Sequence, residues 1–232
     1  ASSIILLEKS LTVLEDGVLE GRNVFGNMMK YIKMTVSSNF GNVFSVLIAS
    51  AFLPFLPMLP VHILTQNLLN DFSQVGMAFD DVDKEYLYRP QKWNSKGVLR
   101  FTFIMGPLSS IFDILCFIIL WWLIGANTIE LAPLFQAGWF VFGTVSQVLV
   151  IYVIRTQKLA IIKSRPAKPL FISTIIIAAI AIIIGFTKAG MGIDLAVLPV
   201  KFLLWLTLLS ITYLVSAELV KKLYIRKFGE WI

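Results

Sequence analysis

The chain has 232 residues, of which 57% are hydrophobic and only 15% charged, and its mean hydropathy is +0.81. Soluble domains are less apolar, so this composition excludes an ordinary soluble enzyme or binding module and predicts an integral membrane protein. The net charge of +6 is expected from basic loops at one membrane face, and no nucleic-acid partner is needed to explain it.

The first residues predict the end of a cytoplasmic domain followed by a stalk. Ile4–Leu7 is a short apolar run typical of a buried strand, and we expect the rest of its sheet to lie upstream. A short helix is expected at Glu8–Asp16, ending near Gly17. A second helix, from Val18, continues toward the membrane without a proline and would form a rigid rod.

Apolar stretches of roughly 20 residues, the length that crosses a bilayer, then occur six times. They are Asn39–Pro57, Met58–Phe79, Phe101–Ile124, Leu134–Ile154, Leu170–Thr187 and Leu198–Ala217. The predicted fold class is all-α integral membrane: a six-helix transmembrane bundle with a short N-terminal strand and a stalk helix from a cytoplasmic domain. The predicted divisions are residues 1–37 for the cytoplasmic part and stalk, 38–218 for the bundle and 219–232 for a cytoplasmic tail.

Basic residues predict the orientation, because loops rich in Lys and Arg stay in the cytoplasm. Only Lys188 and Lys201 fall on the opposite side, so 18 of the 20 basic residues share one face. Both termini are therefore expected in the cytoplasm of a multi-pass plasma-membrane protein, with anionic lipid headgroups as partners. Lys30 and Lys33 are expected to snorkel to the lipid interface.

The second span carries polar residues where lipid would penalise them, in the run Gln66–Asp71. On a helix Asn67, Asn70 and Asp71 share one face, because residues three and four apart are neighbours. A charge near the bilayer centre costs at least about 3 kcal/mol and persists when it faces a protein interior or a watery path. Asp71 has no basic partner within its span, so we expect it to hold a cation or a proton.

The first span repeats this pattern with Asn39 and Asn42, and Gly41 between them permits close helix approach. A proline-rich connection at 54–60 predicts a tight antiparallel hairpin, in which the polar groups of both spans meet at mid-depth. For either asparagine alone, a simple hydrogen bond to a neighbouring helix is the favoured interpretation. Oxygen donors suit hard cations, so magnesium, calcium, sodium and protons remain open, and one carboxylate with several amides fits magnesium best.

Other polar residues have simpler interpretations. Asp113 is a second ion or proton group or, as favoured, a hydrogen-bonded structural residue. His62 is interpreted as packing near the outer interface and Cys116 as core packing. The connections Asp80–Arg100 and Arg155–Lys168 are interpreted as a solvated loop and a topology signal. Three tryptophans are assigned to an aromatic belt at the outer interface: Trp121, Trp122 and Trp139.

Several segments of the chain resemble P-type cation ATPases, most closely the magnesium-transporting class. The resemblance is carried by Glu8–Leu11, Gly17–Arg22, Ser37–Asn42, Gln66–Asp71 and Gly106–Asp113, together with Pro90 and Trp93. It covers the whole chain and assigns its six spans to the last six membrane helices of that family. Residues 1–37 would then hold the end of the phosphorylation domain and the stalk.

The resemblance implies a pump that hydrolyses ATP through an aspartyl phosphate on cytoplasmic domains. Asn39, Asn67 and Asp71 match the family's ion-site positions. Related calcium pumps carry glutamate where this chain has Asn42 and threonine where it has Asn70, and this departure favours magnesium. The expected metal ligands are therefore Asp71, Asn67, Asn39, Asn42 and Asn70.

The chain lacks the Asp-Lys-Thr-Gly, Thr-Gly-Glu and Gly-Asp-Gly motifs of that family. No catalytic residue is therefore expected here, and ATP and the catalytic Mg²⁺ would bind cytoplasmic domains that, like the N-terminal membrane helices, lie elsewhere in the polypeptide. The predicted function is the ion-translocating part of an ATP-driven magnesium importer. The alternatives are an ATP-independent secondary cation transporter or channel, and a noncatalytic membrane scaffold.

Overall fold

A computed structural model describes residues 5, 10–160 and 163–231, and every named element within them is helical. The α-helices are α1 (Leu11–Phe52), α2 (Pro60–Gln74), α3 (Lys84–Leu87), α4 (Ser95–Ile118), α5 (Ala132–Ile154), α6 (Lys168–Phe186) and α7 (Phe202–Phe228). Shorter helical segments are η1 (Val75–Phe79), η2 (Ile119–Ile124), η3 (Ile129–Leu131) and η4 (Lys188–Ile193). Residues 4, 6 and 7 of the predicted strand lie outside the described residues, so that strand stays a prediction.

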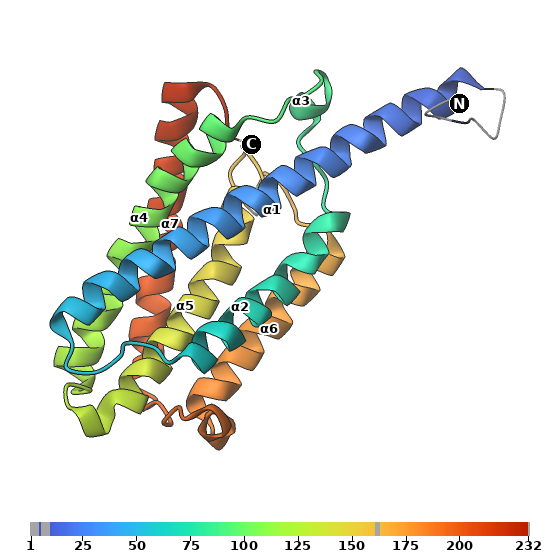
Figure 1. Cartoon of the computed structure of the whole chain (residues 1–232). Helices are drawn as coiled ribbons and strands as arrows, with labels where there is room; N and C mark the ends of the chain where they lie inside the picture. Colours follow the sequence, from blue (N-terminus) through green and yellow to red (C-terminus); the bar gives the residue numbers. More distant parts are fainter. Residues whose placement is uncertain (1–4, 6–9, 161–162, 232) are drawn as a thin grey trace.

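α1 is one continuous helix of 42 residues whose N-terminal part extends away from the bundle (Figure 1). At 1.5 Å per residue it is about 63 Å long, roughly twice the thickness of a bilayer's hydrocarbon core. The predicted run from Val18 into the first span is present. The predicted stop near Gly17 is wrong, because one helical glycine costs only about 1 kcal/mol and the turns on either side hold the helix together.

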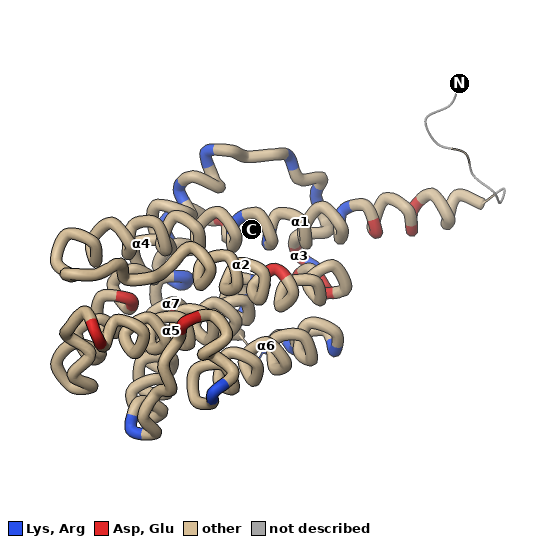
Figure 2. The backbone as a smooth tube through the Cα atoms, turned by 60° about the horizontal axis from the view of Figure 1, so that its bottom comes forward, with Lys and Arg blue, Asp and Glu red and all other residues tan. Residues whose placement is uncertain are grey.

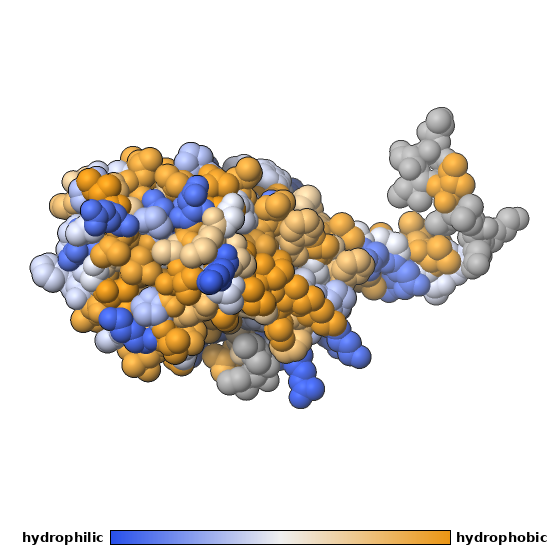
Figure 3. Space-filling model, turned by 90° about the horizontal axis from the view of Figure 1, so that it is seen from below, coloured by the Kyte–Doolittle hydropathy of each residue, from blue (hydrophilic) through white to orange (hydrophobic). Residues whose placement is uncertain are grey.

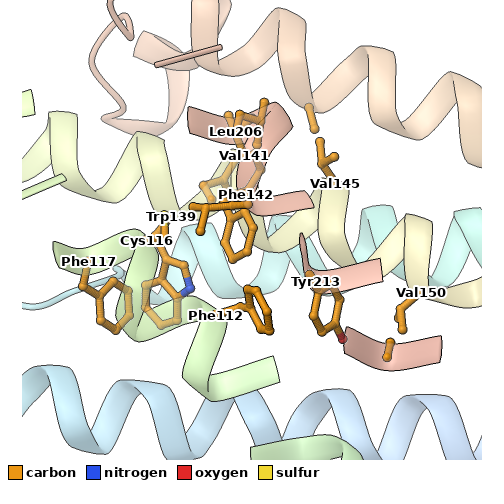
Figure 4. Packing of buried hydrophobic residues seen from close by; sticks show 14 of the residues in the cluster. Phe112, Cys116, Phe117, Trp139, Val141, Phe142, Val145, Val150, Leu206 and Tyr213 are labelled. Carbon is orange, nitrogen blue, oxygen red and sulfur yellow. The ribbon is translucent and has the colours of Figure 1, made fainter. Parts of the chain in front are cut away.

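α5 forms the centre of the bundle, and 94% of its most apolar stretch is buried. The helices α2, α4, α6 and α7 surround it, while α1 lies mainly against α4. Trp139 and Phe142 of α5 pack with Phe112 of α4 and Tyr213 of α7 in the core that Figure 4 shows. Large hydrophobic areas remain on the outer surface (Figure 3), and the tube in Figure 2 carries few charges along the middle of its helices.

Within residues 10–160 and 163–231, five helices are long and apolar enough to cross a membrane. They are Leu11–Phe52, Ser95–Ile124, Ile129–Ile154, Lys168–Phe186 and Phe202–Phe228. The second predicted span corresponds to α2, which has only 15 residues and continues into the five-residue 3₁₀ segment η1. The structure therefore supports a multi-pass helical membrane protein, and the count of six spans remains a prediction.

The predicted tight hairpin of the first two spans is not observed. α1 packs against α4, whereas α2 packs against α5, α6 and η1. The close approach predicted for Gly41 does occur, but with α4: the Ser110 hydroxyl donates to the Gly41 carbonyl oxygen at 2.9 Å. A Cβ on Gly41 would lie 3.0 Å from the Gly106 carbonyl oxygen and would overlap the Ser109 hydroxyl.

Buried charges tie the connections to α1 at one end of the bundle. Arg155 donates two hydrogen bonds to the Asp80 carboxylate, from Nε at 2.8 Å and from Nη2 at 2.9 Å. Lys30 adds a third at 3.2 Å, and the three side chains are at most 1% exposed. The expected snorkelling of Lys30 and the expected solvated position of Asp80 are therefore wrong. Opposite charges and backbone partners make burial possible for all three. We call this group the Asp80 cluster.

The 80–100 connection is also partly buried elsewhere. Tyr86 of α3 is 7% exposed and would contact a Cβ on Gly26 of α1. Burial raises the pKa of Tyr86 to about 12. The connection thus packs against α1 at this point, whereas Lys84 and Glu85 of α3 and the later part, which includes Lys92, are exposed as predicted.

The last described residues fold back onto the bundle. α7 continues to Phe228, and Trp231 is fully buried between Phe101 and Tyr224. The Trp231 indole N–H donates to the Ile154 carbonyl oxygen at 2.9 Å, and its own carbonyl oxygen accepts from Lys33 Nζ at 2.8 Å. Lys33, predicted to snorkel, is also buried. Its ammonium group donates to this carbonyl oxygen and makes a cation–π contact with the Phe101 ring.

Candidate functional site

α2 distributes the residues of the predicted site over different faces. Gln66 and Asn70, about one turn apart, are 3% and 6% exposed and lie inside the bundle. Asn67 is half-buried and Asp71 is exposed. The side chains of Asn70 and Asp71 diverge because consecutive helical residues are separated by about 100°. The predicted convergence of Asn67, Asn70 and Asp71 is therefore not observed within the described chain.

Asn70 belongs to a chain of three side-chain amides that joins α2, α5 and α1. Its Nδ2 donates to Oε1 of Gln147 on α5, and Gln147 Nε2 donates to Oδ1 of Asn42 on α1 at 3.1 Å. The polar groups of the first two spans thus do meet inside the bundle, as predicted, but through a residue of a third helix.

One oxygen of these three side-chain amides, Asn70 Oδ1, has no hydrogen-bond partner among the described residues. The atom is also buried. Such an unsatisfied group costs about 1 to 3 kcal/mol, so natural proteins rarely keep one without a ligand or water. Asn70 therefore offers a free carbonyl oxygen at the point where three helices meet.

A small polar cavity adjoins the amide chain. Its volume is about 20 Å³, which is enough for about one water molecule. Asn42, Gln147 and Asp113 line it, together with four serines. The serines are Ser37, Ser38, Ser109 and Ser146.

Asp71 and Asn39 lie on the outside of the described chain. Asp71 borders an open groove of about 630 Å³ between α1 and the end of α2, together with Asn27, Tyr31 and Gln74. The predicted ligands therefore fall into two pairs. Asn42 and Asn70 are hydrogen-bonded inside the bundle, whereas Asp71 and Asn39 are exposed. Asn67 is half-buried and belongs to neither pair.

Asp113 is buried and hydrogen-bonded, as favoured from the sequence. Its Oδ2 accepts from the Ser45 hydroxyl at 2.6 Å and its Oδ1 accepts from the Trp139 indole N–H at 3.0 Å. The assignment of Trp139 to an interfacial aromatic belt is wrong: the residue is 2% exposed and its ring lies among Phe112 and Phe117 (Figure 4). A buried acceptor for its N–H explains why it packs inside.

His62 has the structural role predicted for it. Its Nδ1 accepts from the Leu59 backbone N–H at 3.2 Å, and its Nε2 lies 2.6 Å from the Ile193 carbonyl oxygen. Because Nδ1 is an acceptor, the proton is assigned to Nε2, which donates to that carbonyl. The neutral ring links the start of α2 to η4. Cys116 is buried in the core, also as predicted.

The chemistry of the site is that of neutral and anionic oxygens. Among the described residues, no group of three or more His, Cys, Asp or Glu side chains is placed to hold a metal. Four buried cations have partners of their own: Lys30 and Arg155 bind Asp80, Lys33 binds the Trp231 carbonyl oxygen, and Lys221 binds Glu218. Amide, hydroxyl and carboxylate oxygens are typical ligands for hard cations and leave room for retained water.

Gln147 is the member of the site that sequence reasoning missed. It lies in the apolar run Leu134–Ile154 without a carboxylate or a second amide beside it. The available signal was a polar side chain in the middle of a span, because such residues usually face the inside of a bundle. Its bridge to both asparagines depends on contacts between helices and could not be predicted from spacing.

Comparisons with known proteins place the chain in a family. Residues 55–223 match the family described as cation transporting ATPase, C-terminus. The chain is 53% identical over 229 residues, 99% of its length, to magnesium-transporting ATPase, P-type 1, from Salmonella typhimurium and from Escherichia coli K12. A calcium-transporting ATPase of Bacillus subtilis is 28% identical over 42% of the chain.

The matched region is a limited part of those proteins. The chain spans 25% and 26% of the length of the Salmonella and E. coli relatives. The family match covers most of the chain, including α2, α4, α5 and α6. The chain belongs to the family of cation-transporting ATPases, whose C-terminal region it matches.

Proposed function

We propose that this chain is the membrane-embedded, ion-binding and translocating part of an ATP-driven magnesium importer. The observation that carries the proposal is the buried, unpartnered Asn70 Oδ1 within the amide chain of Asn42 and Gln147. The names of the two relatives that match over nearly the whole chain support magnesium as the cargo. A few oxygen ligands together with retained waters suit that ion.

The proposed ligands are Asp71, Asn67, Asn39, Asn42 and Asn70, to which we add Gln147. The groove beside Asp71 is open in the described chain, and a carboxylate that faced lipid there would be costly. We therefore propose that membrane helices from the preceding part of the polypeptide cover this groove and bring Asp71 toward the ion. Those helices would supply further oxygen ligands.

The six-span arrangement is part of the same proposal. α2 and η1 together cover about 32 Å, at 1.5 Å per α-helical and 2.0 Å per 3₁₀ residue, which matches a hydrocarbon core of about 30 Å. With the five longer helices this would make six crossings, which would put both termini on one side; the many Lys and Arg residues on that side support the cytoplasm. The plasma membrane is the proposed location.

Coupling to ATP would pass through α1. Its protruding N-terminal part (Figure 1) would join the phosphorylation domain, which would hold ATP and the catalytic Mg²⁺. An inside-negative potential favours inward movement of a divalent ion by roughly 4.6 kcal/mol per 100 mV, at about 2.3 for each charge. ATP would then be needed mainly when external magnesium is scarce.

Anionic lipids are the proposed membrane partners. A groove of about 630 Å³ between α5 and α6 is lined by apolar side chains such as Leu149 and Phe171, with Arg165 and Lys168 at one end. Basic side chains beside an apolar groove suit a negatively charged headgroup with its acyl chain.

The test uses the complete transporter that contains this chain, reconstituted in vesicles. We expect ATP-dependent uptake of magnesium, with Asn70→Ala raising the magnesium concentration for half-maximal ATPase activity about tenfold, the equivalent of about 1.4 kcal/mol. The control is Thr65→Ala on the same helix, whose hydroxyl bonds only within α2, to the Val61 carbonyl oxygen. Magnesium uptake without ATP would instead favour the secondary transporter or channel. An unchanged magnesium response of Asn70→Ala would contradict the site.

A further inference from the structure

Asp113 is a buried carboxylate that the proposed cation site does not use. It is 4% exposed and lies in the middle of the bundle on α4. Among the described residues its hydrogen-bond partners are Ser45 and Trp139, and no ion pair involves it. An ionised carboxylate without a positive partner is costly in such a place, so this position favours a group that can be neutralised.

The two partners of Asp113 differ in what they can do. The Trp139 indole N–H is only a donor, so Oδ1 must remain an acceptor in either protonation state. The Ser45 hydroxyl can donate or accept, and it is 2.6 Å from Oδ2. A proton can therefore bind at Oδ2 when the Ser45 hydroxyl turns from donor to acceptor, while the Trp139 bond stays in place.

The polar cavity connects this carboxyl group to the amide chain. Asp113, Asn42 and Gln147 line the same space of about 20 Å³, which has room for about one water molecule. Because these residues line one enclosed cavity, a change of charge at Asp113 alters the electrostatic energy of a cation bound near Asn42. A nearby dication stabilises the ionised form, and its departure favours the protonated form.

We propose that Asp113 is a proton-binding site that is loaded when the cation site is empty and unloaded when magnesium binds. The step is a proton transfer: a hydronium ion in the cavity gives its proton to Asp113 Oδ2, leaving a neutral carboxyl group and water. Magnesium binding reverses it. This inference rests on the proposed function and adds a second bound species, a proton, at a separate residue.

The other groups near Asp113 are few. Ser45 faces it from α1 and Trp139 from α5, and neither titrates near neutral pH. The titratable neighbours are Tyr213 on α7, which lines the same cavity, and Cys116 one turn along α4. Both are neutral at neutral pH, so Asp113 is the group in this region whose charge can change.

Proton release on magnesium binding tests the inference without requiring turnover. The complete transporter in weakly buffered detergent solution receives magnesium alone, and a pH dye records released protons. The wild type should release about one proton more per molecule than Asp113→Asn, which keeps the shape and can still accept from Trp139. Magnesium-stimulated ATPase activity, measured in parallel, reports on the proposed function separately.

A second variant covers the case in which Asp113→Asn does not fold. Ser45→Ala removes the hydroxyl that stabilises the ionised carboxylate, so the pH midpoint of proton release should shift upward. Ser45→Thr keeps the hydroxyl and should restore the wild-type midpoint. Equal proton release in wild type and Asp113→Asn, or an unchanged midpoint in Ser45→Ala, would overturn the inference even if magnesium transport is intact.

Discussion

At the scale of single residues, neighbouring positions of α2 have opposite surroundings. Asn70 is inside the bundle with a free carbonyl oxygen, and the next residue, Asp71, borders an open groove. A cation held between them would be reached from two sides: by the inner amides of this chain and by groups that cover the groove. In the proposed site Asp71 would supply the charge, and Asn70 and Gln147 would supply the inner ligand geometry.

Replacing Asp71 by asparagine keeps the shape of the side chain and removes its charge. We expect Asp71→Asn to abolish magnesium-stimulated ATPase activity of the complete transporter, because the remaining ligands are neutral. Its thermal stability should not fall, since Asp71 makes no hydrogen bond or ion pair among the described residues. Asp194→Asn, at an exposed position with φ 62° that asparagine tolerates, is the matched control and should remain active.

Asn42 offers a test of ion selectivity. We expect Asn42→Glu to raise the affinity for calcium relative to magnesium, because a second carboxylate permits a more fully dehydrated cage. The neutral variant Asn42→Gln separates charge from length. Competition between the two ions in the ATPase assay measures the ratio, and a ratio that is the same in both variants would contradict the role of charge.

At the scale of elements, contacts at helix ends hold the bundle in register. The Asp80 cluster joins α1, the connection after η1 and the end of α5, and the Ala167 backbone N–H adds a hydrogen bond to Asp80 Oδ1 at 3.0 Å. Close backbone contacts add to this, since a Cβ on Gly76 of η1 would overlap the backbone of Leu170 in α6. Both features can be tested by small substitutions.

Removing the charge of Asp80 should be strongly destabilising. In Asp80→Asn the buried Arg155 and Lys30 lose their counter-charge, which costs about 3 to 5 kcal/mol when one partner of a buried ion pair is removed. Thermal unfolding in detergent measures the loss. The control is Glu230→Gln: Glu230 pairs with Arg100 at 3.5 Å on the surface, and such a pair contributes at most about 1 kcal/mol. Equal effects of the two variants would rule out the predicted importance of burial.

Two glycines should respond to alanine in opposite ways. Gly76→Ala forces η1 away from α6 and should cost about 1 to 3 kcal/mol, as overpacking does. Gly17→Ala meets nothing within 4 Å and should stabilise α1 by about 0.5 to 1 kcal/mol, because alanine loses less backbone freedom in a helix. Unfolding of each variant in denaturant gives the sign, and a stabilising Gly76→Ala would show that the two segments do not approach closely.

At the scale of the whole molecule, hydropathy predicted an integral membrane protein and the five long apolar helices of the described residues. This was possible because length and composition alone define a candidate span. Asn42 and Asn70 were identified as inward polar groups because amides are rare in such spans. Gln147, the burial of Lys30 with Asp80, and the inner position of Trp139 were not predicted. Each depends on a partner 26 to 105 residues away in sequence, and local patterns carry no information about such pairs.

The predicted orientation can be tested with single cysteines. Cys116 is fully buried, so this part of the unmodified protein should resist a membrane-impermeant maleimide. In intact cells that express the complete transporter, Met191→Cys should be labelled, because residue 191 lies on the side opposite to most basic residues. Lys92→Cys should be labelled only after the cells are opened. The reverse pattern would invert the topology.

The continuity of α1 has a mechanical consequence. Lys30, held by the Asp80 cluster, and Asn42, bonded to Gln147, are 12 residues apart on one unbroken helix, which places them about 18 Å apart. With the cluster as a fulcrum, tilting the rod by about 10° would carry Asn42 sideways by about 3 Å, the full length of its bond to Gln147. A small swing of the protruding arm would therefore be enough to separate Asn42 from Gln147 in the proposed site, without any bending of the helix.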